Sequence, residues 1–105
     1  MGWLFLTLAG LAEIAMTTVM RYIDWSLKPG PIIAFLVLTN LSFAFLVVAA
    51  QTIPLGMAYA VWTGIGAAGT VLVGIWYYGE SFTSLQLVFL TTLIASVIGL
   101  KLVSG

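Results

Sequence analysis

The sequence contains no cysteine and no histidine, and charged side chains make up only 6% of its 105 residues. Without cysteine there is no disulfide framework and no thiolate metal site. Without histidine the chain lacks the commonest metal ligand and the side chain that titrates most readily near neutral pH. We therefore expect no metal and no cofactor, and any proton transfer must use Glu13, Asp24, Glu80 or a tyrosine.

The scarcity of charge also excludes an ordinary soluble domain, which carries roughly 25% charged residues. Three basic and three acidic side chains are too few to cover a water-facing surface. Hydrophobic residues make up 63% of the sequence, and its mean hydropathy is +1.24, which is typical of a membrane protein. The formal net charge is zero and no basic run occurs, so nothing indicates a nucleic-acid partner.

Long apolar runs take the place of charge. A membrane-spanning helix needs about 20 mostly apolar residues, and four such runs fit the sequence with short polar turns between them. The first run has no basic residue before it and continues well past Ala12, so we do not interpret it as a signal peptide. The sequence predicts an all-α protein, a single transmembrane domain over residues 1–105 with both termini on one side. The four helices are expected over about residues 3–21, 32–50, 55–78 and 85–103.

Glu13 is the only charged side chain between residues 1 and 20, in the stretch LAGLAEIAMTTVM. It could be a protonated carboxyl that hydrogen-bonds a neighbouring helix and only aids packing. However, ionisable residues inside membranes usually face a cavity and have a function. No basic side chain inside the membrane can pair with Glu13, and burial without such a partner favours the protonated form. We therefore predict a site that holds either a proton or a cation, with Met16 and Thr17 on the same helix face.

The stretch IPLGMAYAVWTGIGAAGT, residues 53–70, has two distinct faces. Gly56, Ala60, Gly64 and Ala68 form a stripe of small residues that permits close approach of another helix. The other face carries Tyr59, Trp62, Thr63 and Gly66. Aromatic rings near a buried carboxylate can bind an organic cation through cation–π attraction, although Trp62 could also simply pack. The glycines at 64 and 66 permit a kink.

These features together resemble the small multidrug resistance family of bacterial exporters, over essentially the whole chain. The resemblance rests on four short spans, a lone glutamate in the first, and the run Ile-Pro-x-Gly-x-Ala-Tyr-Ala-x-Trp-x-Gly-x-Gly. It implies a transporter, not an enzyme: an antiparallel dimer in the bacterial inner membrane that exchanges protons for cations by alternating access. It further implies that Glu13 binds proton and substrate, and that Gly64 and Gly66 form a hinge. The family positions that line or gate the substrate site match Trp3, Ser42, Phe43, Tyr59 and Trp62.

The substrate subtype is divided between two patterns. Guanidinium exporters resemble Glu-x-x-Trp in the first helix, whereas this chain has Met16 at the tryptophan position. The pair Thr17-Thr18 is more similar to quaternary-ammonium exporters. In the last helix, Phe89 and Ser96 replace glycines common in drug exporters, and the ending IGLKLVSG is similar to guanidinium exporters. We expect hydrophobic or quaternary ammonium cations as substrates, with guanidinium-type cations as the alternative.

Assembly and class leave further alternatives. One chain has too few helices to enclose a cation, so we expect at least a dimer. The basic residues of the loops are divided two to one between the membrane sides, which favours an antiparallel homodimer over a heterodimer with a paralogue. A non-transporting proteolipid, or a subunit that only supports a partner, is the rival interpretation. Among the remaining polar residues, Asp24 and Glu80 are expected to be solvated, and Thr91 and Thr92 to hydrogen-bond their own helix.

Overall fold

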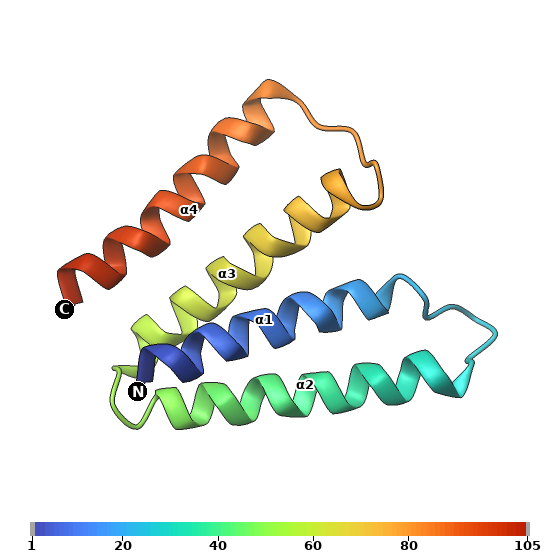
Figure 1. The fold of residues 1–105 in the computed structure, drawn as a ribbon, viewed down its shortest axis with the longest axis horizontal. Coiled ribbons are helices and arrows are strands. Elements are labelled where there is room, and N and C mark those ends of the chain that lie inside the picture. Colours follow the sequence, from blue (N-terminus) through green and yellow to red (C-terminus); the bar gives the residue numbers. More distant parts are fainter. Residues whose placement is uncertain (1, 105) are drawn as a thin grey trace.

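The computed structural model describes residues 2–104 and consists of four α-helices joined by short loops. They are α1 (Gly2–Met20), α2 (Pro29–Ala49), α3 (Leu55–Trp76) and α4 (Ser84–Ser104). Each helix is long and apolar enough to cross a membrane. Loop 1 (residues 21–28) and loop 3 (residues 77–83) lie at one end of the molecule, and loop 2 (residues 50–54) lies at the other (Figure 1). The predicted all-α class with four transmembrane helices is confirmed.

The helix ends follow from local chemistry that hydropathy alone does not show. α2 begins at Pro29, three residues before its apolar run, because proline needs no N–H bond in the first turn of a helix. α3 ends at Trp76, two residues earlier than expected, and Gly79 then takes a positive φ of 67°. α4 starts after a capping box in which Thr83 and Gln86 each accept a hydrogen bond from the other's backbone N–H.

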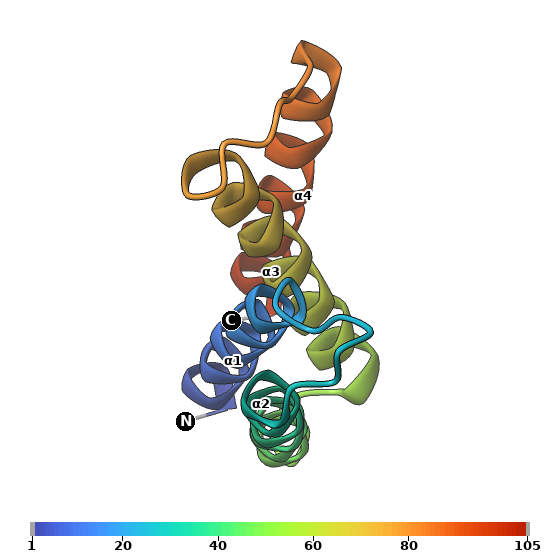
Figure 2. The same cartoon turned by 90° about the vertical axis from the view of Figure 1, so that its right-hand side faces the viewer.

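Helices α1, α2 and α3 pack together, whereas α4 stands on the far side of α3 (Figure 2). The buried cluster comes from α1, α2, loop 2 and α3, and includes Leu6, Leu46, Ile53 and Val61. Within residues 2–104, the α4 backbone packs closely against α3 and against no other helix. The molecule is consequently flat, with extents of 45, 35 and 17 Å.

Small residues of α3 do allow close approach, but not along the whole predicted stripe. At Gly64 an added Cβ would lie 2.5 Å from the Val97 Cγ2 atom of α4, so the crossing of α3 and α4 depends on this glycine. At Gly56 an added Cβ would meet nothing within 4 Å. No helix within residues 2–104 uses the space at Gly56, so that part of the stripe stays a prediction. A different face of α3, which includes Gly66 and Gly69, receives α1.

Most hydroxyls of the membrane-spanning helices bond their own helix. Thr91, Thr92 and Ser96 of α4 each donate to the carbonyl oxygen four residues earlier, at distances of 2.8–2.9 Å. The prediction for Thr91 and Thr92 is confirmed. Such bonds satisfy the hydroxyl hydrogen without any partner from another helix.

Candidate functional site

Glu13 lies where α1 crosses α3, and its carboxylate packs against the backbone of Gly66. An added Cβ at Gly66 would overlap the carboxylate atoms, so only glycine leaves room for them. Among the residues that the structure describes, Glu13 Oε2 is buried and has no hydrogen-bond partner. Buried polar atoms are bonded in the great majority of cases. The site therefore has one open acceptor that can take a proton or an N–H donor from a ligand.

A hydrogen-bond chain connects three helices next to this carboxylate. The indole Nε1–H of Trp62 in α3 donates to Ser42 Oγ in α2 at 2.8 Å. Ser42 Oγ in turn donates to the Ala9 carbonyl oxygen of α1 at 2.7 Å. Ala9 is four residues before Glu13, one helical turn along the same face. These two hydrogen bonds fix the orientation of the Trp62 ring and join the three helices near Glu13.

Two further rings flank Trp62. The Phe43 and Tyr59 ring centroids lie 5.2 Å and 5.6 Å from the Trp62 ring, at tilted angles. Trp62 itself is only 9% exposed, whereas Phe43 and Tyr59 are each about half exposed. Within one chain the accessible ring faces are thus those of Phe43 and Tyr59, while Trp62 is buried and hydrogen-bonded to Ser42.

The other predicted site residues lie at several depths. Trp3 is at the loop 2 end, where the Lys101 Nζ lies 5.0 Å from its ring centroid. Met16 is partly buried on α1, one turn beyond Glu13. α3 continues as an unbroken helix through Gly64 and Gly66, so the hinge stays a prediction. Ser42, Phe43, Tyr59 and Trp62 form one contiguous group, and Trp3 packs against the buried cluster that includes Trp62.

Thr17 has a partner that sequence reasoning missed. Its Oγ1 lies 2.7 Å from Thr70 Oγ1 of α3, so the two hydroxyls join α1 and α3. Thr70 Oγ1 also donates to the Gly66 carbonyl oxygen at 2.6 Å. A signal was present in the sequence, because Thr17 follows Glu13 by four residues and Thr70 follows Gly66 by four.

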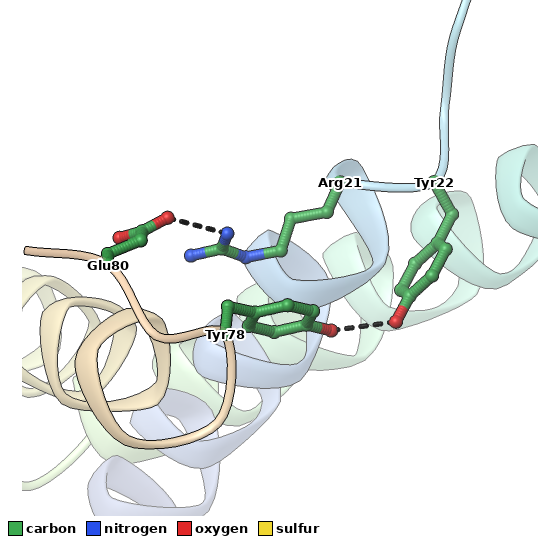
Figure 3. Close-up of polar contacts among 4 residues, drawn as sticks. All are labelled: Arg21, Tyr22, Tyr78 and Glu80. Carbon is green, nitrogen blue, oxygen red and sulfur yellow. Dashed lines mark hydrogen bonds and ion pairs between the residues drawn. The ribbon is translucent and has the colours of Figure 1, made fainter.

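Glu80 in loop 3 is exposed, as expected, but it also forms an ion pair that the sequence did not predict. Its Oε2 accepts a hydrogen bond from Arg21 Nη1 at 2.7 Å (Figure 3). Arg21 also stacks over the Tyr78 ring at 4.1 Å, and the Tyr78 and Tyr22 hydroxyls are 2.8 Å apart. The hydrogen bond that Arg21 donates to Glu80 raises the pKa of Arg21, and the bond with Tyr22 raises the pKa of Tyr78.

Asp24 lies farther along loop 1 and is exposed, as expected. Its carboxylate accepts hydrogen bonds from the hydroxyl and the backbone N–H of Ser26. These two bonds lower the pKa of Asp24 and keep it ionised. The loop therefore carries an ion pair at its start and an internally bonded carboxylate near its middle.

Comparisons with known proteins agree with this architecture. Residues 1–93 match the family model described as Small Multidrug Resistance protein. The chain is 44% identical over 105 residues to the membrane protein YvdR of Bacillus subtilis (strain 168), covering 100% of this chain and 99% of that protein. It is 39% identical to a guanidinium exporter of Salmonella typhimurium (strain LT2) and 40% identical to a guanidinium exporter of Citrobacter freundii. Both matches extend over 102 residues and cover 97% of each chain.

Proposed function

The chain belongs to the small multidrug resistance family of bacterial inner-membrane transporters, and we propose that it exports guanidinium-type cations in exchange for protons. The observation that carries the proposal is the partly buried Glu13, whose Oε2 atom is buried and has no hydrogen-bond partner in the described part of the chain. All four helices act in this proposal as one transmembrane domain. No chemical conversion of the cation is involved.

Exchange follows from two ligands competing for one carboxylate. A proton and a cation cannot both neutralise Glu13, so binding of one releases the other. A planar guanidinium group presents paired N–H donors that match the two oxygens of a carboxylate. The guanidinium exporters that share 39–40% of this sequence support this substrate class. They favour the class that the sequence pattern placed second.

Hydrophobic or quaternary ammonium cations remain a second candidate for a specific reason. The half-exposed rings of Phe43 and Tyr59 offer faces that attract a cation without hydrogen-bond donors. Met16, one turn from Glu13, supplies a flexible apolar side chain and no N–H group. Such a lining suits cations of loosely defined shape.

The functional unit in this proposal is an antiparallel dimer of identical chains. One chain is only 17 Å thick along its shortest axis, too thin to surround a cation, and it has one intramembrane acid. A second, oppositely oriented chain would complete the site. A heterodimer with a paralogue is the alternative, and the weak bias of Arg21 and Lys28 against Lys101 leaves both orientations open to the chain.

Purified protein in liposomes tests the substrate proposal. An imposed proton gradient should drive guanidinium uptake or release, and guanidinium addition should drive proton movement in the opposite direction. Tetrapropylammonium is tested in parallel, and the Glu13→Gln variant provides the blank. Proton-coupled movement of tetrapropylammonium without guanidinium would replace the first candidate with the second. No coupled movement of either cation would favour the non-transporting alternative.

Labelling of loop 1 tests the dimer. Trp25 is 98% exposed and the chain has no native cysteine, so Trp25→Cys gives a single surface thiol. An impermeant thiol reagent applied to intact cells, and then to permeabilised cells, measures the fraction of chains in each orientation. Near-equal fractions support the homodimer. Labelling from one face alone would mean that the unit is a heterodimer.

A further inference from the structure

Polar and small residues meet in register along the contact between α1 and α3. On α1 they recur every four residues, at Glu13, Thr17 and Arg21, the last just beyond the helix end. On α3 the facing positions recur with the same spacing. We call this set the polar seam, and it consists of Glu13, Thr17, Arg21, Gly66, Thr70 and Gly74. With a rise of 1.5 Å per residue, it runs about 12 Å from Glu13 to the surface at loops 1 and 3.

The two sides of the seam are in contact at each level. The Glu13 carboxylate packs on Gly66, and the Thr17 and Thr70 hydroxyls are 2.7 Å apart. At the outermost level, an added Cβ on Gly74 would overlap the Glu80 carboxylate and lie 2.9 Å from Arg21 Nη2. The Arg21–Glu80 ion pair therefore lies directly over the end of the seam.

The middle level has fewer hydrogens than hydrogen-bond contacts. Thr17 Oγ1 is 2.9 Å from the Ile14 carbonyl oxygen, and Thr70 Oγ1 is 2.6 Å from the Gly66 carbonyl oxygen. With the contact between the two hydroxyls, that makes three contacts for two hydroxyl hydrogens. One contact is always without a hydrogen, so each hydroxyl can rotate between a carbonyl oxygen and its neighbour. Such a pair can pass a proton or bind a water molecule.

The outer level depends on how loop 3 folds back. Gly79 has a φ of +67°, a conformation that favours glycine, and the Glu80 N–H then donates to the Gly74 carbonyl oxygen at 2.9 Å. This turn directs the Glu80 side chain across α3 to Arg21. The Tyr22 and Tyr78 hydroxyls are hydrogen-bonded beside the ion pair (Figure 3).

We propose that the Arg21–Glu80 ion pair is a clasp that closes the polar seam, and so controls access to Glu13 from the loop 1 and loop 3 side. The proposal rests on the exchange function of Glu13 given above. The two side chains are 27% and 50% exposed, and ion pairs this exposed shift equilibria by only about fivefold or less. The clasp is therefore weak enough to open in every transport cycle. Arg21 and Glu80 act as positioning residues and do not touch the cation.

A single cysteine in the seam reports on the clasp. Thr70→Cys is introduced into the otherwise cysteine-free chain, which is placed in nanodiscs so that both faces are open to reagent. An uncharged, impermeant maleimide measures the labelling rate at low ionic strength. Against this background we expect Glu80→Gln and Arg21→Gln each to raise the rate about threefold to fivefold. The exchanged pair, Arg21→Glu with Glu80→Arg, should return the rate close to its starting value.

Two controls separate the clasp from general loosening. Lys28→Gln removes a loop 1 charge that makes no ion pair within residues 2–104, and it should leave the rate unchanged. High salt screens exposed ion pairs, so about 1 M salt should raise the rate with Arg21 and Glu80 intact, but not in Glu80→Gln. The expected rise with salt is measured with Arg21 and Glu80 both intact, so it tests the proposal even if a clasp variant does not fold.

Three results would overturn the clasp: equal rates in all variants with no effect of salt, an exchanged pair as reactive as the single variants, or rapid labelling with the clasp intact. The labelling uses neither substrate nor a proton gradient. A wrong substrate class would therefore leave these rates interpretable. Coupled guanidinium export together with unchanged labelling rates would refute the clasp proposal and leave the proposed exchange function standing.

Discussion

The two contacts that α3 makes, with α1 and with α4, are built in opposite ways. Toward α1, α3 offers glycines, a threonine hydroxyl and backbone that accommodate the Glu13 carboxylate. Toward α4 it offers Gly64 against the Val97 methyl group, and the described residues show no hydrogen bond between the two helices. The first contact holds polar groups in place inside the membrane. The second is a crossing of apolar surfaces.

This difference separates the candidate site from the exposed surface of α4. The three-helix unit α1–α3 contains Glu13 and the hydrogen bonds that link Trp62 through Ser42 to Ala9. It also contains the Phe43 and Tyr59 rings beside Trp62. α4 has no buried residue among those described, and Phe89 and Val88 are among its exposed side chains. Substitutions in the three-helix unit should therefore change cation binding and exchange. Substitutions on α4 should change how the exposed face of the chain contacts lipid or a second chain.

The largest effect is expected for Glu13→Gln. The amide has nearly the shape of the carboxyl group but cannot ionise, so proton-driven export and cation binding should both be abolished while the helices remain. Liposome transport and calorimetric binding measure the loss, and circular dichroism measures the fold. Glu13→Asp keeps the charge and should retain exchange with a shifted pH optimum. Proton-driven export by Glu13→Gln would show that the carboxylate is not the exchange group.

Cation affinity in the unmodified protein should rise with pH through the neutral range. The cation binds the ionised carboxylate, and raising the pH removes the proton that competes with it. The same competition predicts that proton release accompanies cation binding in weakly buffered solution. Titration calorimetry at several pH values measures both quantities, and a pH-independent affinity would mean that proton and cation use different groups.

Gly66→Ala should have the next largest effect. Its methyl group overlaps the Glu13 carboxylate, so either the carboxylate or α1 has to move. We expect cation affinity to fall by at least about tenfold, equivalent to about 1.4 kcal/mol. Gly56→Ala adds the same methyl group to the same helix where nothing lies within 4 Å, and it should bind as the parent does. Equal losses in both variants would attribute the effect to helix flexibility and not to contact with Glu13.

A smaller effect is expected for Trp62→Phe, which removes the indole N–H and keeps an aromatic ring. The lost hydrogen bond to Ser42 should lower the free energy of unfolding by about 1 kcal/mol. Ser42→Ala breaks the same bond from the other side, so the double variant should lose less than the sum of the two. Unfolding in detergent mixtures measures these values. Additive losses would mean that Trp62 stabilises the protein by ring packing alone.

The smallest effect on the single-chain fold is expected for Phe89→Ala in α4, within about 0.5 kcal/mol, because the side chain is exposed. Leu6→Ala, in the buried cluster, should lower the free energy of unfolding by at least about 2 kcal/mol, because it leaves a cavity. Crosslinking of dimers in membranes then sharpens the comparison. A Phe89→Ala variant that folds but no longer dimerises would place the second chain on α4.

Much of the fold could be predicted because bilayer crossing imposes long apolar runs. The same reasoning identified Glu13, since a lone acid among apolar residues is evident from the sequence alone. The Arg21–Glu80 pair was not predictable, because its members are 59 positions apart and meet only through the turn at Gly79. Thr70 was missed because a membrane hydroxyl can bond its own helix, as Thr91 does. The stripe of small residues predicted the close approach at Gly64, but a repeat in the sequence does not show how far along it a neighbouring helix follows.

The hydroxyls in the middle of α4 have a mechanical consequence. Thr91, Thr92 and Ser96 each use their hydrogen on their own backbone, so they offer no donor to a helix packed alongside. Along this stretch, such a neighbour would be held by shape and dispersion forces, which vary gradually as one surface slides over another. A small rotation or shift in register would break no hydrogen bond there. In the proposed dimer, a second chain that packs on the centre of α4 could therefore tilt against it without breaking a hydrogen bond there, while the polar contacts of α1 and α3 stay intact.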